Sequence, residues 1–263
     1  MSGLIIKQKA YEISGQVIQN FKDDPGFGLK RNDGKKRPTT WIRGIVLHTT
    51  KGIPGGKVRT PQKIIPGVGP NLRRDERVAR MWSLDARNAG AHLIVDADGS
   101  WVCTADLANF AAYHAGNVNS VTIGIEIYQG SDGSIYEKQL ENVCIMVDFL
   151  TRHFGIQRQF HWPYRHRAIR RGLQKGRDMV GIYGHRDCSN NRGLGDPGDA
   201  VFDRIQACGY ESYNFDHDED KSIWKQRQEQ LGLLKDGIPG PMTLKALKKK
   251  GYKHGLWVSR PGD

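Results

Sequence analysis

Two histidines and one aspartate, far apart in the chain, have the residue types and local settings of metal ligands. His48 follows the apolar residues 45–47, which form the core of the segment 42–47, and His185 follows the apolar run 179–183 after one glycine. Both runs have the length and β-branched content of short buried strands, so both imidazoles are expected at the rim of a sheet. Asp196 lies on the loop that follows His185. An imidazole at a strand end and a carboxylate on a returning loop can reach one ion.

This set of ligands is typical of an open catalytic zinc site. Three protein ligands leave the fourth tetrahedral position of zinc to water. Zinc lowers the pKa of a bound water to about 7 and polarises a substrate carbonyl, and an inert amide needs both effects to be hydrolysed. A single histidine with a single aspartate would more often be a solvated loop. The second histidine at a strand end favours the metal site.

Five short motifs follow one another along the chain: IVLHTT at 45–50, AHLIV at 91–95 with Asp98-Gly99, YHAGN at 113–117, IGIEI at 123–127, and Gly184-His185 with Asp196-Pro197-Gly198. In this order they resemble the motifs of the zinc-dependent N-acetylmuramoyl-L-alanine amidases, the family that includes phage T7-type lysozyme and the peptidoglycan recognition proteins. No single motif is specific, but their order is. The resemblance covers roughly residues 41–209.

The resemblance implies that zinc is bound by His48, His185 and Asp196. Cys188 is an alternative third ligand, because relatives of the recognition-protein type use cysteine as the third ligand, at the position where this chain has Asp196. The Pro197-Gly198 pair aligns Asp196, rather than Cys188, with the ligand. We therefore expect Asp196 to be the third ligand.

Glu126 is the candidate proton carrier. It alternates with isoleucines in the run 123–127, so its side chain should face the cleft while theirs face the packed side of the sheet. The resemblance implies that a glutamate in this motif takes a proton from the zinc-bound water and passes it to the leaving amine. A glutamate in an ion pair at the surface is the alternative.

The resemblance also places His92, His114 and Asn117 near the cleft, as candidates for substrate binding. For the two histidines, an equal alternative is a hydrogen-bonded core imidazole that orients a neighbour. Many family members carry Lys or Thr two residues before the third ligand, where it stabilises the oxyanion, but this chain has Leu194 there. Arg192 is a candidate replacement, because a guanidinium is a permanently charged donor.

The pattern of elements predicts an α/β domain with a mixed central β-sheet flanked by helices. Strands are expected at 42–47, 91–96, 101–104, 121–128 and 179–183, and helices at 72–86, 140–154 and 199–205. Asp98-Gly99 between two apolar runs indicates a hairpin. The Gly- and Pro-rich segment 52–71 is expected to be a long loop lining the cleft.

Four segments are expected along the chain. Residues 1–40 should form a loosely packed N-terminal extension with one strand near 11–13, residues 41–209 the amidase domain, and residues 210–222 a polar linker. Residues 223–263 resemble a helical peptidoglycan-binding module, through Gln-x-x-Leu-Gly-Leu at 228–233 and the Asp-Gly-Ile turn at 236–238. A plain helical hairpin is the alternative for this small all-α segment.

The charge of the chain bears on its partners. Its cysteines and its first residues bear on where it is found. The formal net charge is +12, and the densest basic cluster lies at 165–177; it is either a polyanion-binding surface or a solvated insertion. The four cysteines lack CxxC spacing, which favours reduced thiols although the even count leaves pairing open. The first residues carry charges where a signal peptide needs an apolar core, and the sequence has no apolar run of membrane-spanning length.

Together these features predict a zinc amidase that cleaves the bond between muramic acid and L-alanine in peptidoglycan. A wall-binding module would raise its concentration at an insoluble substrate. Synthesis in the cytoplasm and action on the wall after release or secretion would fit an endolysin or a delivered lytic enzyme. The alternatives are a muropeptide-binding protein without activity and, less favoured, a metal-dependent nuclease.

Overall fold

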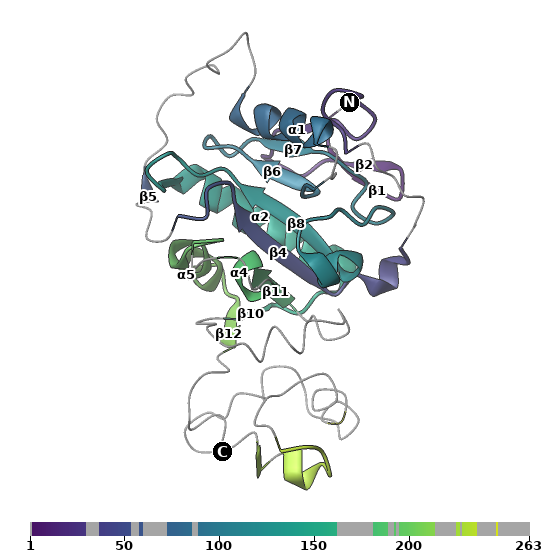
Figure 1. The fold of residues 1–263 in the computed structure, drawn as a ribbon, viewed down its shortest axis with the longest axis vertical. Helices are drawn as coiled ribbons and strands as arrows, with labels where there is room; N and C mark the ends of the chain where they lie inside the picture. The colour runs from purple at the N-terminus through teal and green to yellow at the C-terminus, as the bar shows by residue number, and fades with distance from the viewer. Residues whose placement is uncertain are drawn as a thin grey trace.

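A single mixed β-sheet forms the centre of the protein (Figure 1). The computed structural model describes residues 2–29, 37–53, 58–59, 73–85, 89–161, 181–188, 192, 195–213, 225–226, 228–235 and 246. Within these residues the central sheet has eight strands in the order β12-β10-β11-β4-β8-β6-β7-β3. The strands are β3 (Ile18–Asn20), β4 (Gly44–Thr49), β6 (Leu93–Val95), β7 (Trp101–Cys103), β8 (Thr122–Ile127), β10 (Gln159–His161), β11 (Gly181–Gly184) and β12 (Glu211–Tyr213).

Six neighbouring strands, from β12 across to β6, run parallel to one another. The β6–β7 hairpin reverses the direction, and β3 then pairs parallel with β7. The turn of this hairpin contains Gly99 at φ +84°, a conformation that glycine adopts without strain. The expected α/β class, the mixed sheet and the Asp98-Gly99 hairpin are all confirmed.

Side chains alternate between the two faces of the sheet, and each face is covered by helices. On one face the isoleucines and leucines of β4, β6 and β8 form the main core with α2 (Glu137–Phe154) and α5 (Asp199–Ala207). On the other face Ile94 and Val102 pack against Ala79 of α1 (Arg74–Leu84). Val46 and Tyr183 pack beside the 3-10 helix η2 (Gly116–Val121).

The helices form close to where the sequence predicts them. The apolar stripe of α2 is buried against the sheet, and the helix ends at Gly155, whose φ of +64° makes it a left-handed C-cap. Helix α1 begins at Arg74 with Asp75 and Glu76 in its first turn. Carboxylates at this end interact favourably with the positive end of the helix dipole. A short 3-10 helix η1 (Thr39–Trp41) precedes β4, and α4 (His185–Cys188) follows β11 directly.

The expectation of a loose N-terminal extension is wrong for residues 2–29. Strands β1 (Leu4–Ile6) and β2 (Lys9–Tyr11) form an antiparallel pair, and the three residues of β1 belong to the main core. The buried Asp106 carboxylate accepts hydrogen bonds from the backbone N–H groups of Lys7 and Gln8 at the turn of that pair. Strand β3 is an edge strand of the central sheet. Short apolar strands separated by turns give a weak sequence signal, which explains the error.

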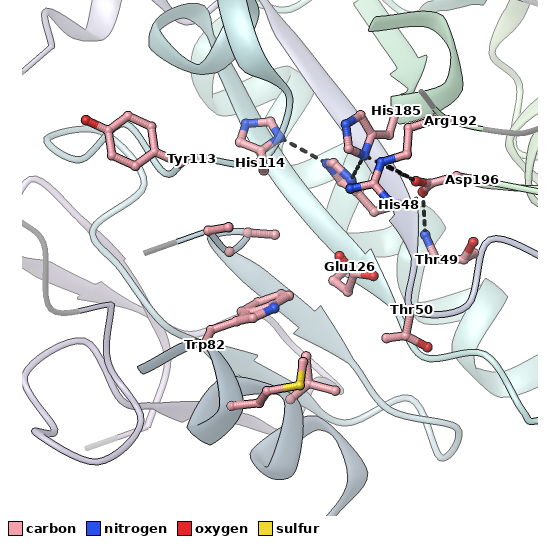
Figure 2. A pocket seen from close by; sticks show the side chains of 15 residues that line it. His48, Thr49, Thr50, Trp82, Tyr113, His114, Glu126, His185, Arg192 and Asp196 are labelled. Carbon is pink, nitrogen blue, oxygen red and sulfur yellow. Dashed lines mark hydrogen bonds and ion pairs between the residues drawn. The ribbon is translucent and has the colours of Figure 1, made fainter. Parts of the chain in front are cut away.

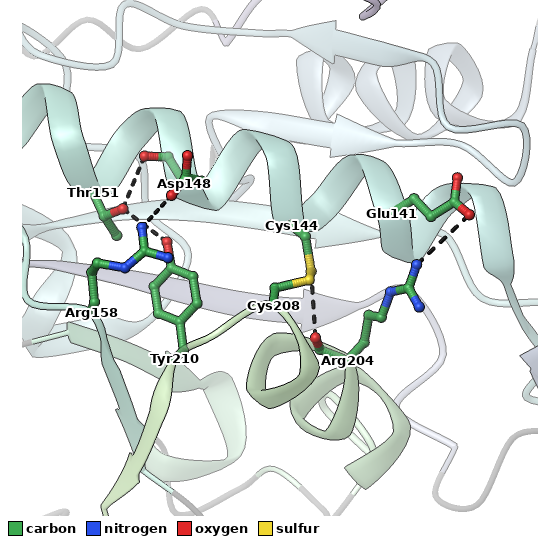
Figure 3. Close-up of a disulfide and its surroundings, with 8 residues drawn as sticks. All are labelled: Glu141, Cys144, Asp148, Thr151, Arg158, Arg204, Cys208 and Tyr210. Atoms are coloured by element: carbon green, nitrogen blue, oxygen red, sulfur yellow. Dashed lines mark hydrogen bonds and ion pairs between the residues drawn. A yellow bond between two sulfur atoms is a disulfide. The ribbon is translucent and has the colours of Figure 1, made fainter.

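A disulfide joins Cys144 of α2 to Cys208 at the end of α5, with Cα atoms 6.4 Å apart (Figure 3). This corrects the expectation of reduced thiols for that pair. The two cysteines lie 64 residues apart, so no local spacing signals the bond. Cys103 and Cys188 are free thiols. The bond fixes α5, which begins three residues after Asp196, to the long helix α2.

Three further expectations differ from the structure or lie outside its described part. Glu211–Tyr213, expected to begin the linker, is strand β12 of the sheet. Within the expected cleft loop, β5 (Val58–Arg59) pairs with β9 (Ile135–Tyr136). The basic cluster 165–177 and most of 223–263 lie outside the described residues. Among the described residues, no helix combines the length and apolar character needed to cross a bilayer.

Candidate metal centre and active site

The structure brings the three expected metal ligands together at one end of the parallel strands (Figure 2). His48 lies near the end of β4, His185 directly follows β11, and Asp196 lies on the loop before α5. Their ligand atoms all lie within 4.8 Å of one another. Nδ1 of His48 is 2.9 Å from Nδ1 of His185, which is 3.2 Å from Oδ2 of Asp196. All three side chains are buried.

Backbone hydrogen bonds hold Asp196 in position. The N–H of Thr49 donates to Oδ1 of Asp196 at 3.0 Å, which leaves Oδ2 directed toward the imidazole of His185. The Thr49 hydroxyl donates to the carbonyl of Gly195 at 2.5 Å. The N–H of Arg186 donates to the carbonyl of Asp196 at 2.8 Å. The residues after each histidine therefore fix the loop that carries the carboxylate.

The chemistry of these side chains fits a divalent cation. Burial lowers the pKa of His48 well below its usual value, and the neighbouring His185 and His114 lower it further. A neutral imidazole offers a lone pair, which is the form that binds metals. Two imidazoles and one carboxylate oxygen are the ligand types of a three-ligand site that leaves a coordination position open. The structure thus contains a candidate metal site at His48, His185 and Asp196.

Glu126 lies beside this site on the central sheet. It is the register partner of His48 in the β4–β8 pair, and both line the same pocket. The neighbouring isoleucines of β8 point into the main core, so Glu126 faces the opposite side, as the alternation predicted. Burial raises the pKa of Glu126 to about 8, Asp196 adds to the rise, and Arg192 opposes it. A carboxyl group with this pKa can both hold and release a proton near neutral pH.

The pocket has a volume of about 240 Å³ and two unlike walls. One wall carries the candidate metal ligands with Glu126 and Arg192. The other is mainly apolar and is formed by Val78, Met81 and Trp82 of α1 with Ala89, Gly90, Ala91 and Tyr113. Figure 2 shows Trp82 and Tyr113 on the side of the pocket away from Asp196. A substrate in this pocket therefore contacts charged groups on one side and apolar surface on the other.

The apolar wall was not predicted from the sequence. Val78, Met81 and Trp82 are spaced by three and four residues, as expected for one face of a helix, which is the signal that could have identified them. Met81 is 60% exposed although it lines the pocket, so an interior position does not account for its apolar side chain. The Thr49 N–H was also missed, because backbone donors leave no trace in residue type.

Arg192 lines the pocket next to Asp196. Its Nε lies 3.6 Å from Oδ2 of Asp196, and about half of its side chain is exposed. The guanidinium can therefore reach both the carboxylate and a bound substrate. Leu194, at the position where many family members carry Lys or Thr, lies outside the described residues.

The three residues expected to bind substrate differ in where they lie relative to the pocket. His92 is fully buried and does not line the pocket: its Nδ1 accepts from the N–H of Gly124 at 3.0 Å, and its Nε2 lies 3.0 Å from the carbonyl of Phe110. His92 is therefore a core histidine, which corrects the expected substrate contact. His114 lines the pocket, but both its ring nitrogens bond to protein groups. Asn117 lies in η2, and its side chain is outside the described residues.

Cys188, the alternative third ligand, is not part of the candidate metal site among the described residues. Burial, with Asp187 and Asp196 nearby, raises the pKa of its thiol well above the usual value. A raised pKa disfavours the thiolate that binds metals. The geometry therefore favours Asp196.

Comparison with known proteins finds a curated relative and solved structures that are similar to this chain. A curated probable N-acetylmuramoyl-L-alanine amidase of Bacillus licheniformis is 24% identical over 146 residues, which cover 54% of this chain and 37% of the relative. The chain thus spans well under half of the relative's length. The endolysin LysCS of Clostridium intestinale has a TM-score of 0.37 at 20% identity, covering 65% of this chain and 85% of that one. The endolysin of Thermus scotoductus bacteriophage Ph2119 has a TM-score of 0.42 at 17% identity, covering 74% and 99%.

The family comparison covers the part of the chain that carries the site. The family model described as N-acetylmuramoyl-L-alanine amidase matches residues 36–199, which is more than half of the chain. The matched segment contains both histidines, the aspartate and the glutamate of the pocket. The chain therefore belongs to the N-acetylmuramoyl-L-alanine amidase family.

Proposed function

We propose that this protein is a zinc-dependent peptidoglycan hydrolase that cleaves the amide bond between muramic acid and the L-alanine of the stem peptide. The observation that carries the proposal is the convergence of His48, His185 and Asp196 at a pocket that also holds Glu126. Family membership supports the reaction type. Zinc is the metal that best suits two imidazoles and one carboxylate with an open position.

Five residues of the pocket have assigned tasks in this reaction. His48, His185 and Asp196 hold the metal, which when bound lowers the pKa of water and polarises the scissile carbonyl. Glu126 takes a proton from the attacking water and delivers it to the leaving nitrogen. Arg192 lies on the same wall and stabilises the negative charge that develops on the carbonyl oxygen.

The products follow from this bond cleavage. Water adds to the carbonyl carbon, and the carbon–nitrogen bond then breaks. The lactyl group of muramic acid leaves as a carboxylate, and the stem peptide leaves with a free amino group on L-alanine. The apolar wall formed by Val78, Met81 and Trp82 gives the methyl groups near the scissile bond a surface to pack against.

Digestion of purified sacculi tests the proposal. The expected result is a time-dependent release of L-alanine amino termini, found by amine labelling and mass analysis, without new reducing sugar ends. Chelation should stop the release and added zinc should restore it. Release of reducing ends, or cleavage at other peptide bonds, would refute the assignment.

The same assay separates the two alternative functions. A recognition protein without activity would bind sacculi and release nothing in the presence of zinc. A metal-dependent nuclease would nick plasmid DNA in parallel reactions, whereas the amidase should leave plasmid DNA intact.

We also propose that residues 223–263 bind the cell wall and that the protein acts there after release or secretion from the cytoplasm, as an endolysin does. The support is the sequence resemblance of residues 228–238 to peptidoglycan-binding modules. Full-length protein kept inactive by chelation should still co-sediment with sacculi. Loss of co-sedimentation on chelation would place wall binding in the zinc site instead.

A further inference from the structure

We propose that Thr122 and His114 select the tautomer of His48, so that its Nδ1 lone pair faces the metal-binding position. His114 and Thr122 are then positioning residues that act through His48 and do not contact the substrate. The inference rests on the proposed metal site. It also predicts a proton position in the metal-free protein, which can be measured independently of any activity.

The Val118 carbonyl can accept a hydrogen bond but cannot donate one, and this sets the direction of the hydrogen bonds of Thr122 and His114. The Thr122 hydroxyl lies 2.8 Å from the carbonyl of Val118 and 3.1 Å from Nε2 of His114. A hydroxyl has one proton, and a carbonyl can only accept, so this proton goes to Val118. Thr122 must therefore accept from His114, whose Nε2 carries the ring proton.

The proton position on His48 follows from that on His114. With its proton on Nε2, a neutral His114 has a lone pair on Nδ1, which lies 3.0 Å from Nε2 of His48. Nε2 of His48 must donate to it, so His48 carries its proton on the side away from the metal site. Nδ1 of His48 then carries a lone pair. This nitrogen lies 2.9 Å from Nδ1 of His185, which lies 3.2 Å from Oδ2 of Asp196. A metal-binding histidine commonly needs such a partner on its other nitrogen.

The position of His114 is built into the surrounding backbone. The Asn119 side chain accepts from the N–H groups of His114 and Ala115, which fixes the backbone at the ring. The ring lies against Gly124 of β8, where an added Cβ would meet its Cγ at 2.6 Å and its Nδ1 at 2.7 Å. Just before β6, His92 accepts from the N–H of Gly124, and the rings of His92 and His114 meet edge to face with their centroids 5.6 Å apart. Only glycine at 124 leaves room for this arrangement.

The alternative tautomer has a specific consequence. If His114 carried its proton on Nδ1, it would donate to Nε2 of His48 and move the His48 proton to Nδ1. That proton would then occupy the position where a metal must bind. Replacing Thr122 with valine removes the acceptor for the His114 Nε2 proton and so favours this reversed arrangement. Thr122→Ser keeps the hydroxyl and should keep the native order.

Two measurements on full-length protein test the proposal. Ring ¹⁵N shifts of the metal-free protein should show His48 protonated at Nε2 in wild type and Thr122→Ser, and a mixture or reversal in Thr122→Val. Zinc affinity from chelator competition should fall by about 10- to 100-fold in Thr122→Val and return close to wild type in Thr122→Ser. Thr151→Val is the matched control, because Thr151 is a buried threonine in α2 whose hydroxyl also donates to a backbone carbonyl.

The outcomes distinguish this proposal from the proposed function. A His48 proton on Nδ1 in metal-free wild type would overturn the inference, as would equal zinc affinity in Thr122→Val and Thr122→Ser. An equal loss in Thr151→Val would reveal a general packing effect and also count against it. If no form of the protein binds zinc, the proposed function fails, while the ring ¹⁵N shifts still decide the tautomer.

Discussion

His48 on β4 and Glu126 on β8 are register partners in a parallel strand pair and project from the same face of the sheet. Their separation is therefore set by the backbone of two central strands and not by a loop. The other two candidate ligands reach this point from the first residue of α4, directly after β11, and from the loop before α5. A metal ligand and a proton carrier are thus held side by side on two adjacent strands inside the sheet.

Glu126→Gln should lower kcat on sacculi by on the order of 10²- to 10⁴-fold, the usual contribution of a general acid–base group. Glutamine has nearly the same shape but cannot carry the proton. Zinc content should stay at the wild-type level, because Glu126 is not one of the candidate ligands. Turnover by labelled amino termini and zinc content by elemental analysis are the two readouts. Unchanged turnover would remove Glu126 as the proton carrier.

The stability of the metal-free protein should fall as pH rises, in part because of Glu126. Its pKa is about 8 in the fold against a usual 4.5, so the unfolded chain loses this proton first as pH rises. The contribution is fully present below about pH 4.5 and is lost as pH rises through about 8. Glu126→Gln should therefore match wild type in acid and exceed it in melting temperature near pH 8.

Comparison of wild type with Glu126→Gln isolates the contribution of Glu126 to the pH dependence of stability. Burial also raises the pKa values of Asp75 and Asp96, which add to the pH dependence in both proteins and cancel in the difference. Thermal melts in chelator at several pH values are sufficient. Parallel curves for wild type and Glu126→Gln would contradict the raised pKa.

Reduction of the Cys144–Cys208 disulfide should destabilise the fold by about 2–4 kcal/mol, the typical contribution of a native disulfide. The bond closes a long segment of chain, so its loss increases the freedom of the unfolded state. Urea denaturation with and without reductant measures the change. The Cys144→Ser/Cys208→Ser double variant should be insensitive to reductant. If reductant shifts both proteins equally, the bond does not form in solution.

Arg192→Ala should lower kcat by roughly 10²-fold, as expected for loss of one donor to the oxyanion. The guanidinium is about half exposed and 3.6 Å from Asp196, so metal binding should change little. Arg192→Lys should recover part of the activity, because an ammonium supplies charge without the planar donor geometry. A loss of zinc together with activity would instead assign Arg192 to holding Asp196.

Much of the fold could be predicted because its strands and helices have clear periodicities. Alternation in 123–127 correctly placed Glu126 opposite the isoleucines, and the apolar stripe correctly placed α2. The N-terminal strands β1 and β3 were missed because three-residue strands give no period to read. Their place in the sheet and core depends on partners distant in the chain.

The candidate site was predictable where residue types carry the chemistry and not where geometry does. His48, His185 and Asp196 stood out by type and by position at strand ends, and the structure brings them together. The roles of His92 and His114 depend on which groups their ring nitrogens meet, and those partners come from separate segments. The disulfide depends likewise on the packing of α5 against α2.

The measurement that tests the central claim most directly is the zinc content of the purified protein and of its ligand variants. Wild type should bind one zinc per chain and release L-alanine amino termini from sacculi. His48→Ala, His185→Ala and Asp196→Ala should each bind zinc much more weakly and lose this activity while remaining folded. Full zinc binding in a triple variant lacking all three side chains, or amidase activity in chelated wild type, would contradict the account.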